Sequence, residues 1–157
     1  MTTTTRLSLQ KINGSDFVSP NVFNENFDKI DELGVDYVIE SGRSGIWRYQ
    51  VWKSGKFECW GNWTTPVADY TTPWYNTFYP GHGFTCPNWP KTLSEAPVVN
   101  MTVTRYLRDQ TWGYTGIWDV FTTAVNNENC GCLISSDKKE ANVSVVVAIH
   151  AVGAINV

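Results

Sequence analysis

The pattern of apolar and polar residues changes once along the chain, from a helical period to a strand period. In the first part, apolar residues recur at spacings of four and three residues, which places them on one side of a helix. The residues of this apolar stripe are Phe23, Phe27, Ile30 and Leu33. Ser19 and Pro20 suit the start of the helix, because serine caps free N–H groups and proline fits the first helical position. Gly34 suits its end, so the sequence predicts a helix over residues 20–33.

A helix of about four turns is only marginally stable alone in water, so its apolar stripe must pack against something. One possibility is the β domain of the same chain. The other is a short parallel bundle with further copies of the chain, which the four–three spacing favours. In the second case the four apolar residues form an oligomer interface.

From Val35 onward the alternation is that of strands. Segments 46–52 and 57–63 flank the turn Lys53-Ser54-Gly55-Lys56, which predicts a hairpin with Trp47 and Val51 on one face. Arg48 and Glu58 could form a charge pair across this hairpin if the register of the two strands allows it. Residues 41–45 are expected to form a turn. The other predicted strands cover 37–40, 98–106, 112–121, 130–135 and 143–152, with one or two short strands near 77–79 inside the proline-rich stretch 64–96.

Short strands with turn signals every eight to twelve residues are typical of an antiparallel sandwich. The predicted fold class is therefore all-β, an antiparallel β-sandwich head with a short N-terminal α-helix. The predicted domains are an N-terminal arm and oligomerisation helix over residues 1–34 and a β-sandwich head over residues 35–157.

Composition excludes several classes. The net charge is −3 and the 12 lysines and arginines do not cluster, which argues against a nucleic-acid partner. No stretch approaches the roughly 20 apolar residues of a membrane span. The first residues are threonine-rich and lack the apolar core of a signal peptide. We therefore expect synthesis in the cytoplasm, without export by a signal peptide and without a membrane partner.

The sequence offers no recognisable catalytic or metal site. The 4 cysteines are expected to be reduced thiols, and the spacing of Cys130 and Cys132 is too tight for a zinc-ligand pair. His82 is expected in a surface loop and His150 in a strand. No nucleophile elbow or phosphate-binding glycine loop is present, and the carboxylates are scattered. The expectation is a protein that is not an enzyme, with no catalytic residues, no metal and no cofactor.

Aromatic residues are more promising, because they make up 14% of the chain, with 8 tryptophans. One small core cannot absorb them all, and exposed rings on loops suit sugar faces and subunit interfaces. The candidate ligand-binding residues are Trp74, Tyr75, Tyr79, Trp89, Trp112 and Tyr114. The alternative is that these rings hold long loops against the sheet or fill the interfaces between subunits.

Two stretches carry a resemblance. One is Val22-Phe23-Asn24-Glu25-Asn26-Phe27-Asp28-Lys29-Ile30-Asp31; the other runs from Trp47-Arg48-Tyr49 through Ser54-Gly55 to Glu58-Cys59-Trp60-Gly61. Together they resemble the N-terminal helix and the tryptophan-rich hairpin of tail-fibre and receptor-binding proteins of bacteriophages and prophages. The resemblance implies a homotrimer whose head binds a cell-surface glycan or protein. A looser likeness is to the trimeric H-type lectin sandwich, from which no site residue can be transferred.

The function expected from this resemblance is a non-catalytic structural protein of a phage tail, a tail-tip or fibre component for attachment to the host surface. Its expected location is the virion, and its partners are copies of itself, other phage tail proteins and a host cell-surface glycan. Two alternatives remain open: a carbohydrate-active enzyme fragment of a phage tail, or a bacterial cell-surface lectin.

Overall fold

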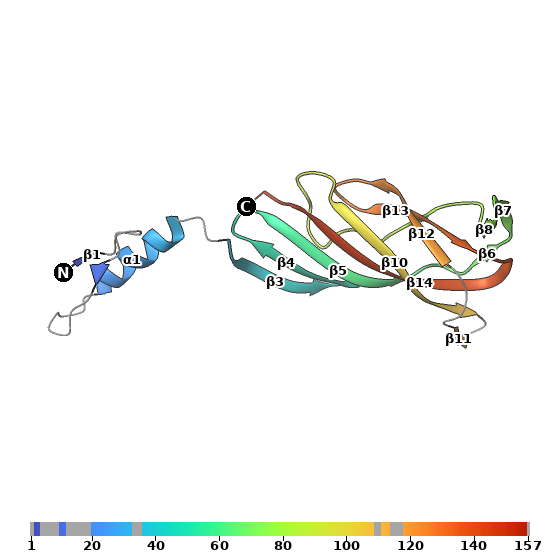
Figure 1. Ribbon diagram of the computed structural model, residues 1–157, viewed down its shortest axis with the longest axis horizontal. Coiled ribbons are helices and arrows are strands. Elements are labelled where there is room, and N and C mark those ends of the chain that lie inside the picture. Colours follow the sequence, from blue (N-terminus) through green and yellow to red (C-terminus); the bar gives the residue numbers. More distant parts are fainter. Residues whose placement is uncertain are drawn as a thin grey trace. The chain divides into compact units, whose positions relative to one another are not determined.

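The computed structural model describes residues 2–3, 10–11, 20–32, 36–108, 111–113 and 118–156 (Figure 1). The chain divides into two compact units, Met1–Tyr37 and Val38–Val157, which are described separately.

The described residues of the N-terminal unit include one helix, α1, which spans Pro20–Glu32. It begins at the proline that the sequence places at its first position, so the predicted helix is confirmed. Two short strands, β1 at Thr2–Thr3 and β2 at Gln10–Lys11, pair antiparallel. Phe27 is 63% exposed on α1. The oligomerising role of the helix stays a prediction.

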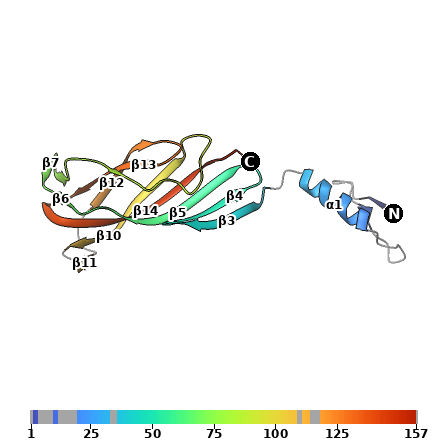
Figure 2. The same ribbon diagram turned by 180° about the vertical axis from the view of Figure 1, so that it is seen from behind.

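The second unit is a head made of two antiparallel sheets, which confirms the all-β sandwich (Figures 1 and 2). The larger sheet has the order β11-β10-β14-β5-β4-β3, and β6 also pairs with β14. Its strands are β3 (Val38–Ser44), β4 (Trp47–Trp52), β5 (Lys56–Thr64), β6 (Ala68–Tyr70), β10 (Val98–Arg108), β11 (Thr111–Gly113) and β14 (Glu140–Ala154). The smaller sheet has the order β12-β13-β8-β7, with β9 on β13. Its strands are β7 (Thr72–Trp74), β8 (Thr77–Tyr79), β9 (Phe84–Thr85), β12 (Trp118–Val125) and β13 (Cys130–Ser136).

The predicted tryptophan-rich hairpin is confirmed as β4 and β5. Its turn is closed by a hydrogen bond from the Gly55 N–H to the Trp52 carbonyl oxygen at 2.9 Å, and Gly55 has a φ of 83°, which glycine adopts easily. The possible charge pair does not form, because the register places Trp60 opposite Arg48 and places Gln50 opposite Glu58.

The predicted turn at residues 41–45 is also wrong. Strand β3 continues to Ser44, and the turn is limited to Gly45 and Ile46. Because β3 is an edge strand and its side chains are largely exposed, its polar residues Ser41 and Arg43 need no core partner.

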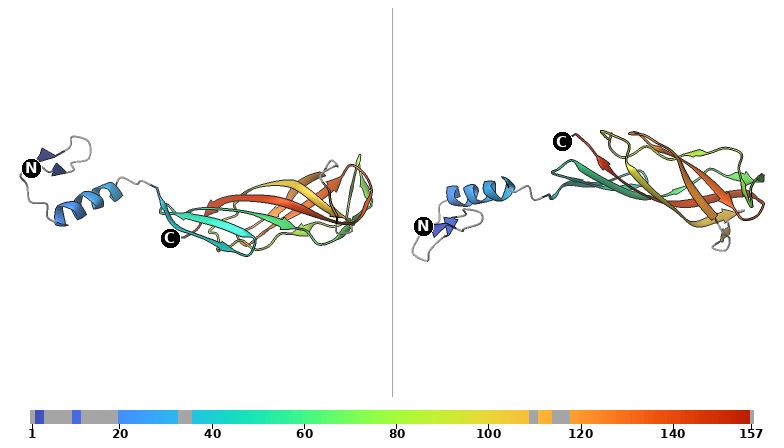
Figure 3. Two further views of the ribbon diagram at one scale, coloured as in Figure 1. Left: turned by 90° about the horizontal axis from the view of Figure 1, so that it is seen from below. Right: turned by 45° about the horizontal axis from the view of Figure 1, so that its top comes forward.

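The core lies between the two sheets and is built by alternation. Trp47 and Val51 of β4 lie on one face, as the hairpin pattern predicted, and this face is buried together with Phe57 and Cys59 of β5. Strand β14 runs between β5 and β10 along the large sheet (Figure 3). Its stretch 143–147 is buried throughout, so this strand is the apolar centre of the head.

The proline-rich stretch contributes to this core through residues 84–94, which we call the strap. Its backbone is hydrogen-bonded to the start of β13 and to the loop before it: the Cys86 N–H donates to the Cys130 carbonyl oxygen at 2.8 Å, and the Trp89 N–H donates to the Glu128 carbonyl oxygen at 2.7 Å. Leu93 is bonded in the same way and is buried. The strap is thus fixed to the sandwich, and its apolar side chains fill the interior.

Candidate functional site

Strands β7 and β8 form a hairpin with a two-residue loop, at the end of the sandwich opposite the point where β3 begins (Figure 1). Trp74 pairs with Thr77 across the turn, and the Thr77 hydroxyl donates to the Trp74 carbonyl oxygen at 2.9 Å. This local geometry brings together three of the predicted ligand-binding residues, Trp74, Tyr75 and Tyr79.

Trp74 is the centre of this group of rings. Its ring centroid lies 6.1 Å from that of Tyr75, 6.0 Å from that of Tyr79 and 6.1 Å from that of Phe121. We call these four residues the tip cluster. Phe121 was missed by sequence reasoning, because only the pairing of β12 with β13 brings it to this end. The rings are tilted or edge-on to one another, and several faces remain exposed.

Tyr75 has an unusual backbone. Its φ of 50° lies in the left-handed region, which costs energy for a residue with a side chain. Its side chain is 94% exposed, so no core packing compensates for this strain. Tyr75 is the first residue of the two-residue loop between Trp74 and Thr77, where the turns favoured in hairpins need a positive φ, so the turn accounts for its backbone and leaves its ring exposed to solvent.

The other predicted site residues lie elsewhere. Trp89 is only 6% exposed, its ring lies 5.2 Å from that of Trp47, and its Nε1–H donates to the Asn126 carbonyl oxygen at 3.1 Å. The prediction that Trp89 binds a ligand from an exposed loop is therefore wrong, because both its ring and its N–H are used inside the core. Trp112 lies in β11, and its side chain is outside the described part, as is all of Tyr114.

The predicted oligomer interface is only partly described. Phe27 is exposed on α1, the side chains of Phe23 and Ile30 are outside the described part, and so is Leu33.

A second surface lies on the outer face of the large sheet. The register sets Arg43 opposite Arg48, Arg48 opposite Trp60, Trp60 opposite His150 and His150 opposite Asn100. Opposed residues in antiparallel strands share a face, so these five form one row across β3, β4, β5, β14 and β10. We call it the outer row. Sequence reasoning missed it, because no short-range pattern reveals which residues of distant strands stand opposite one another.

The outer face is hollowed on both sides of Trp60, which is 38% exposed. One hollow of about 290 Å³ is lined by Trp60, Asn62, Asn100, Thr102 and His150, together with backbone around them. A second, of about 500 Å³, lies toward the two arginines and also includes Trp60. A third, of about 360 Å³, is lined by Trp60, both arginines and Gln50, among others. Trp60 thus borders all three.

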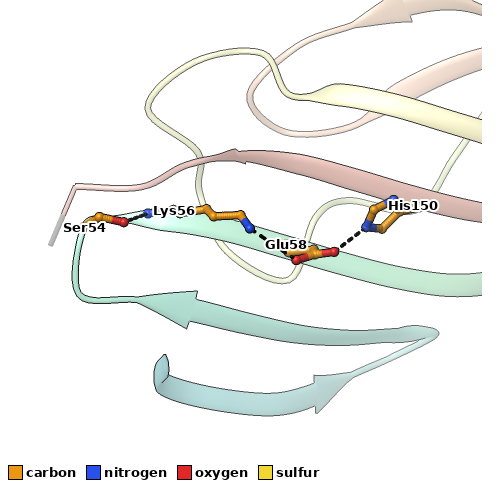
Figure 4. Close-up of polar contacts among 4 residues, drawn as sticks. All are labelled: Ser54, Lys56, Glu58 and His150. Atoms are coloured by element: carbon orange, nitrogen blue, oxygen red, sulfur yellow. Dashed lines mark hydrogen bonds and ion pairs between the residues drawn. The ribbon is translucent and has the colours of Figure 1, made fainter. Parts of the chain in front are cut away.

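The charges on this face are divided. The Glu58 carboxylate contacts two basic side chains (Figure 4). Its Oε1 lies 2.7 Å from Nε2 of His150, and its Oε2 lies 3.7 Å from Nζ of Lys56. Among the described residues, Arg43 and Arg48 have no ion pair. The face therefore offers a ring, amide and hydroxyl groups, and two guanidinium groups that no carboxylate neutralises.

Neither surface contains a described metal site. In the described ranges no three His, Cys, Asp or Glu side chains are placed to hold an ion. The four cysteines are free and buried. Burial, and to a lesser extent the charge of Glu58, raises the pKa of the Cys59 thiol to about 12. His82 lies in a loop, with Nδ1 3.1 Å from the Pro80 carbonyl oxygen. No helix in the described part is long and apolar enough to span a membrane.

Comparisons of the chain with known protein families, curated proteins and solved structures found no match.

Proposed function

We propose that the chain is a non-catalytic structural protein of a bacteriophage tail, a tail-tip or fibre component whose head attaches to a glycan on the host surface. The observation that carries the proposal is the tip cluster. It gathers exposed rings at the end of the sandwich farthest from the start of β3, with the ring of Tyr75 94% exposed at the hairpin turn.

This placement suits attachment for a physical reason. Aromatic faces pack against the C–H faces of sugars, and they lose little side-chain entropy because a tyrosine or tryptophan has only two rotatable angles. The rigid sheets behind the hairpin hold the rings in place, as binding residues on loops are commonly held.

Trimer formation is part of the same proposal. The exposed Phe27 on α1 would pack against the same residue of two further copies in a short bundle. Cyclic closure also protects sheet edges, and here β3 and β11 are the outer strands of the large sheet. Other tail proteins would bind the trimer in the virion.

The test compares binding of the full chain to intact host cells and to a glycan array for three variants. Trp74→Ala and Tyr75→Ala should each lower the apparent affinity at least tenfold, by about 1.4 kcal/mol, with little change in melting temperature for Tyr75→Ala. Val67→Ala is the matched control, because Val67 is another exposed apolar residue of the head.

Unchanged binding by both aromatic variants would remove the tip cluster from the attachment role. A lower melting temperature with unchanged binding would assign these rings to structure. Release of sugar from any polysaccharide by the purified chain would replace the proposal with the carbohydrate-active enzyme.

A further inference from the structure

The outer row is an arrangement that the core does not require. Its five residues point away from the interior, while their neighbours Trp47, Cys59 and Ile149 are buried on the other face. Trp60 stands in the centre of the sheet with its side chain outward, is 38% exposed and borders three hollows. An exposed ring in a hollowed polar face marks a binding surface.

Two arginines stand beside this ring at a cost. Arg43 and Arg48 are opposite one another in the register, and like charges in that position destabilise a sheet. The nearby carboxylate of Glu58 does not relieve this, because its two oxygens face His150 and Lys56. The chain as a whole carries a net charge of −3, so this local excess of positive charge is not a general property of its surface. An anion from outside would relieve it.

The ligand can be narrowed by what lies on each side of Trp60. Guanidinium forks bind carboxylates through two parallel hydrogen bonds. On the other side, Asn62, Asn100 and Thr102 line the hollow of about 290 Å³ with amide and hydroxyl groups, which match the hydroxyl groups of a sugar. A molecule that satisfies both sides has a ring with an apolar face, several hydroxyl groups and a carboxylate.

We propose that the outer row is a second binding site, which takes a saccharide that carries carboxylate groups, such as a chain of hexuronic acid units. Trp60 stacks on a sugar ring, Arg43 and Arg48 bind its carboxylate, and the asparagines contact its hydroxyl groups. The site is on a different face from the tip cluster and does not depend on it. A second copy of the chain is the competing occupant, because tryptophan and arginine are also enriched at subunit interfaces, and the oligomer mass of the variants distinguishes the two.

The experiment measures binding of the full chain by calorimetry to oligogalacturonate, to the same oligomer with its carboxylates methyl-esterified, and to poly(glycerol phosphate). The unmodified oligomer should bind, and esterification should lower the affinity at least tenfold, equal to about 1.4 kcal/mol. Arg48→Gln and Trp60→Ala should each reduce binding by a similar factor. The affinity of Arg48→Lys should lie between those of the unmodified chain and Arg48→Gln, because lysine keeps the positive charge but cannot form two parallel hydrogen bonds to a carboxylate.

Lys139→Gln is the control, because it removes one positive charge from the turn before β14, outside the outer row. It should bind as the unmodified chain does. Melting temperature and light scattering are recorded for every variant, so that unfolding and dissociation are not mistaken for loss of a contact.

Absence of binding to oligogalacturonate overturns the proposal, as does equal binding of the esterified oligomer or tighter binding of the phosphate polymer. A fall in oligomer mass in Arg48→Gln and Trp60→Ala would assign the face to an interface between copies instead. Tyr75→Ala should leave uronate binding intact, so failure at the tip and failure at the outer row give different results.

Discussion

Trp89→Ala is expected to destabilise the head strongly, although Trp89 belongs to a proline-rich stretch that reads as a surface loop. The side chain is 6% exposed, and its removal opens a cavity against the ring of Trp47. Such truncations cost about 3–5 kcal/mol. The lost hydrogen bond to the Asn126 carbonyl adds about 1 kcal/mol. A domain of ordinary stability holds only about 5–15 kcal/mol in total.

Urea denaturation followed by circular dichroism measures this loss. With a slope of about 2 kcal/mol per molar urea, a loss of about 4 kcal/mol moves the midpoint down by about 2 M. Trp89→Phe keeps most of the ring and loses the N–H, so it should lose about 1 kcal/mol. Tyr75→Ala should change the free energy of unfolding by less than about 0.5 kcal/mol, because its side chain is solvated. A midpoint for Trp89→Ala equal to that of the unmodified chain would refute the core assignment.

Two further predictions concern the thiols and the helix. Because burial raises the pKa of Cys59 to about 12, this thiol should react with a soluble disulfide reagent at pH 8 about a thousandfold more slowly in the folded chain than in the unfolded one. The folded thiol holds its proton above the pH at which the unfolded thiol ionises, so the contribution of Cys59 to the free energy of unfolding is fully present below pH 9 and falls as the pH rises toward 12. Titration of the thiols in denaturant should count four. Phe27→Asp should lower the trimer mass found by light scattering while the circular dichroism of the head is unchanged, and a monomeric unmodified chain would contradict the bundle.

Much of the fold could be predicted because it depends on local signals. The β4–β5 hairpin follows from alternation around Ser54 and Gly55, and α1 follows from the proline start and the apolar stripe. The C-terminal end of β3 could not be predicted from local signals, because the polar residues of an exposed edge strand are of the same types as those of a turn. The absent Arg48–Glu58 pair shows the same limit, since a register is set by the whole ladder and by the turn.

The candidate sites also differ in whether their residues are close together in the sequence. Trp74, Tyr75 and Tyr79 lie within six residues of one another, so a hairpin was enough to gather them. Trp89 has a similar sequence setting, yet the strap's hydrogen bonds to the loop before β13 draw it into the core. The outer row combines strands from residue 43 to residue 150, and nothing local in the sequence marks Trp60 as its centre.

The position of β14 in the chain has a consequence for biosynthesis. It is the latest of the described strands, yet it lies between β5 and β10 and is hydrogen-bonded to both. While the ribosome is still making residues 140–154, β5 has only β4 beside it and β10 lacks its main partner. Closing the separation of Glu58 from Val152 is slow compared with forming a hairpin. We therefore expect the nascent head to expose apolar strand faces until synthesis has passed β14, with proteases cutting ribosome-bound chains up to that length.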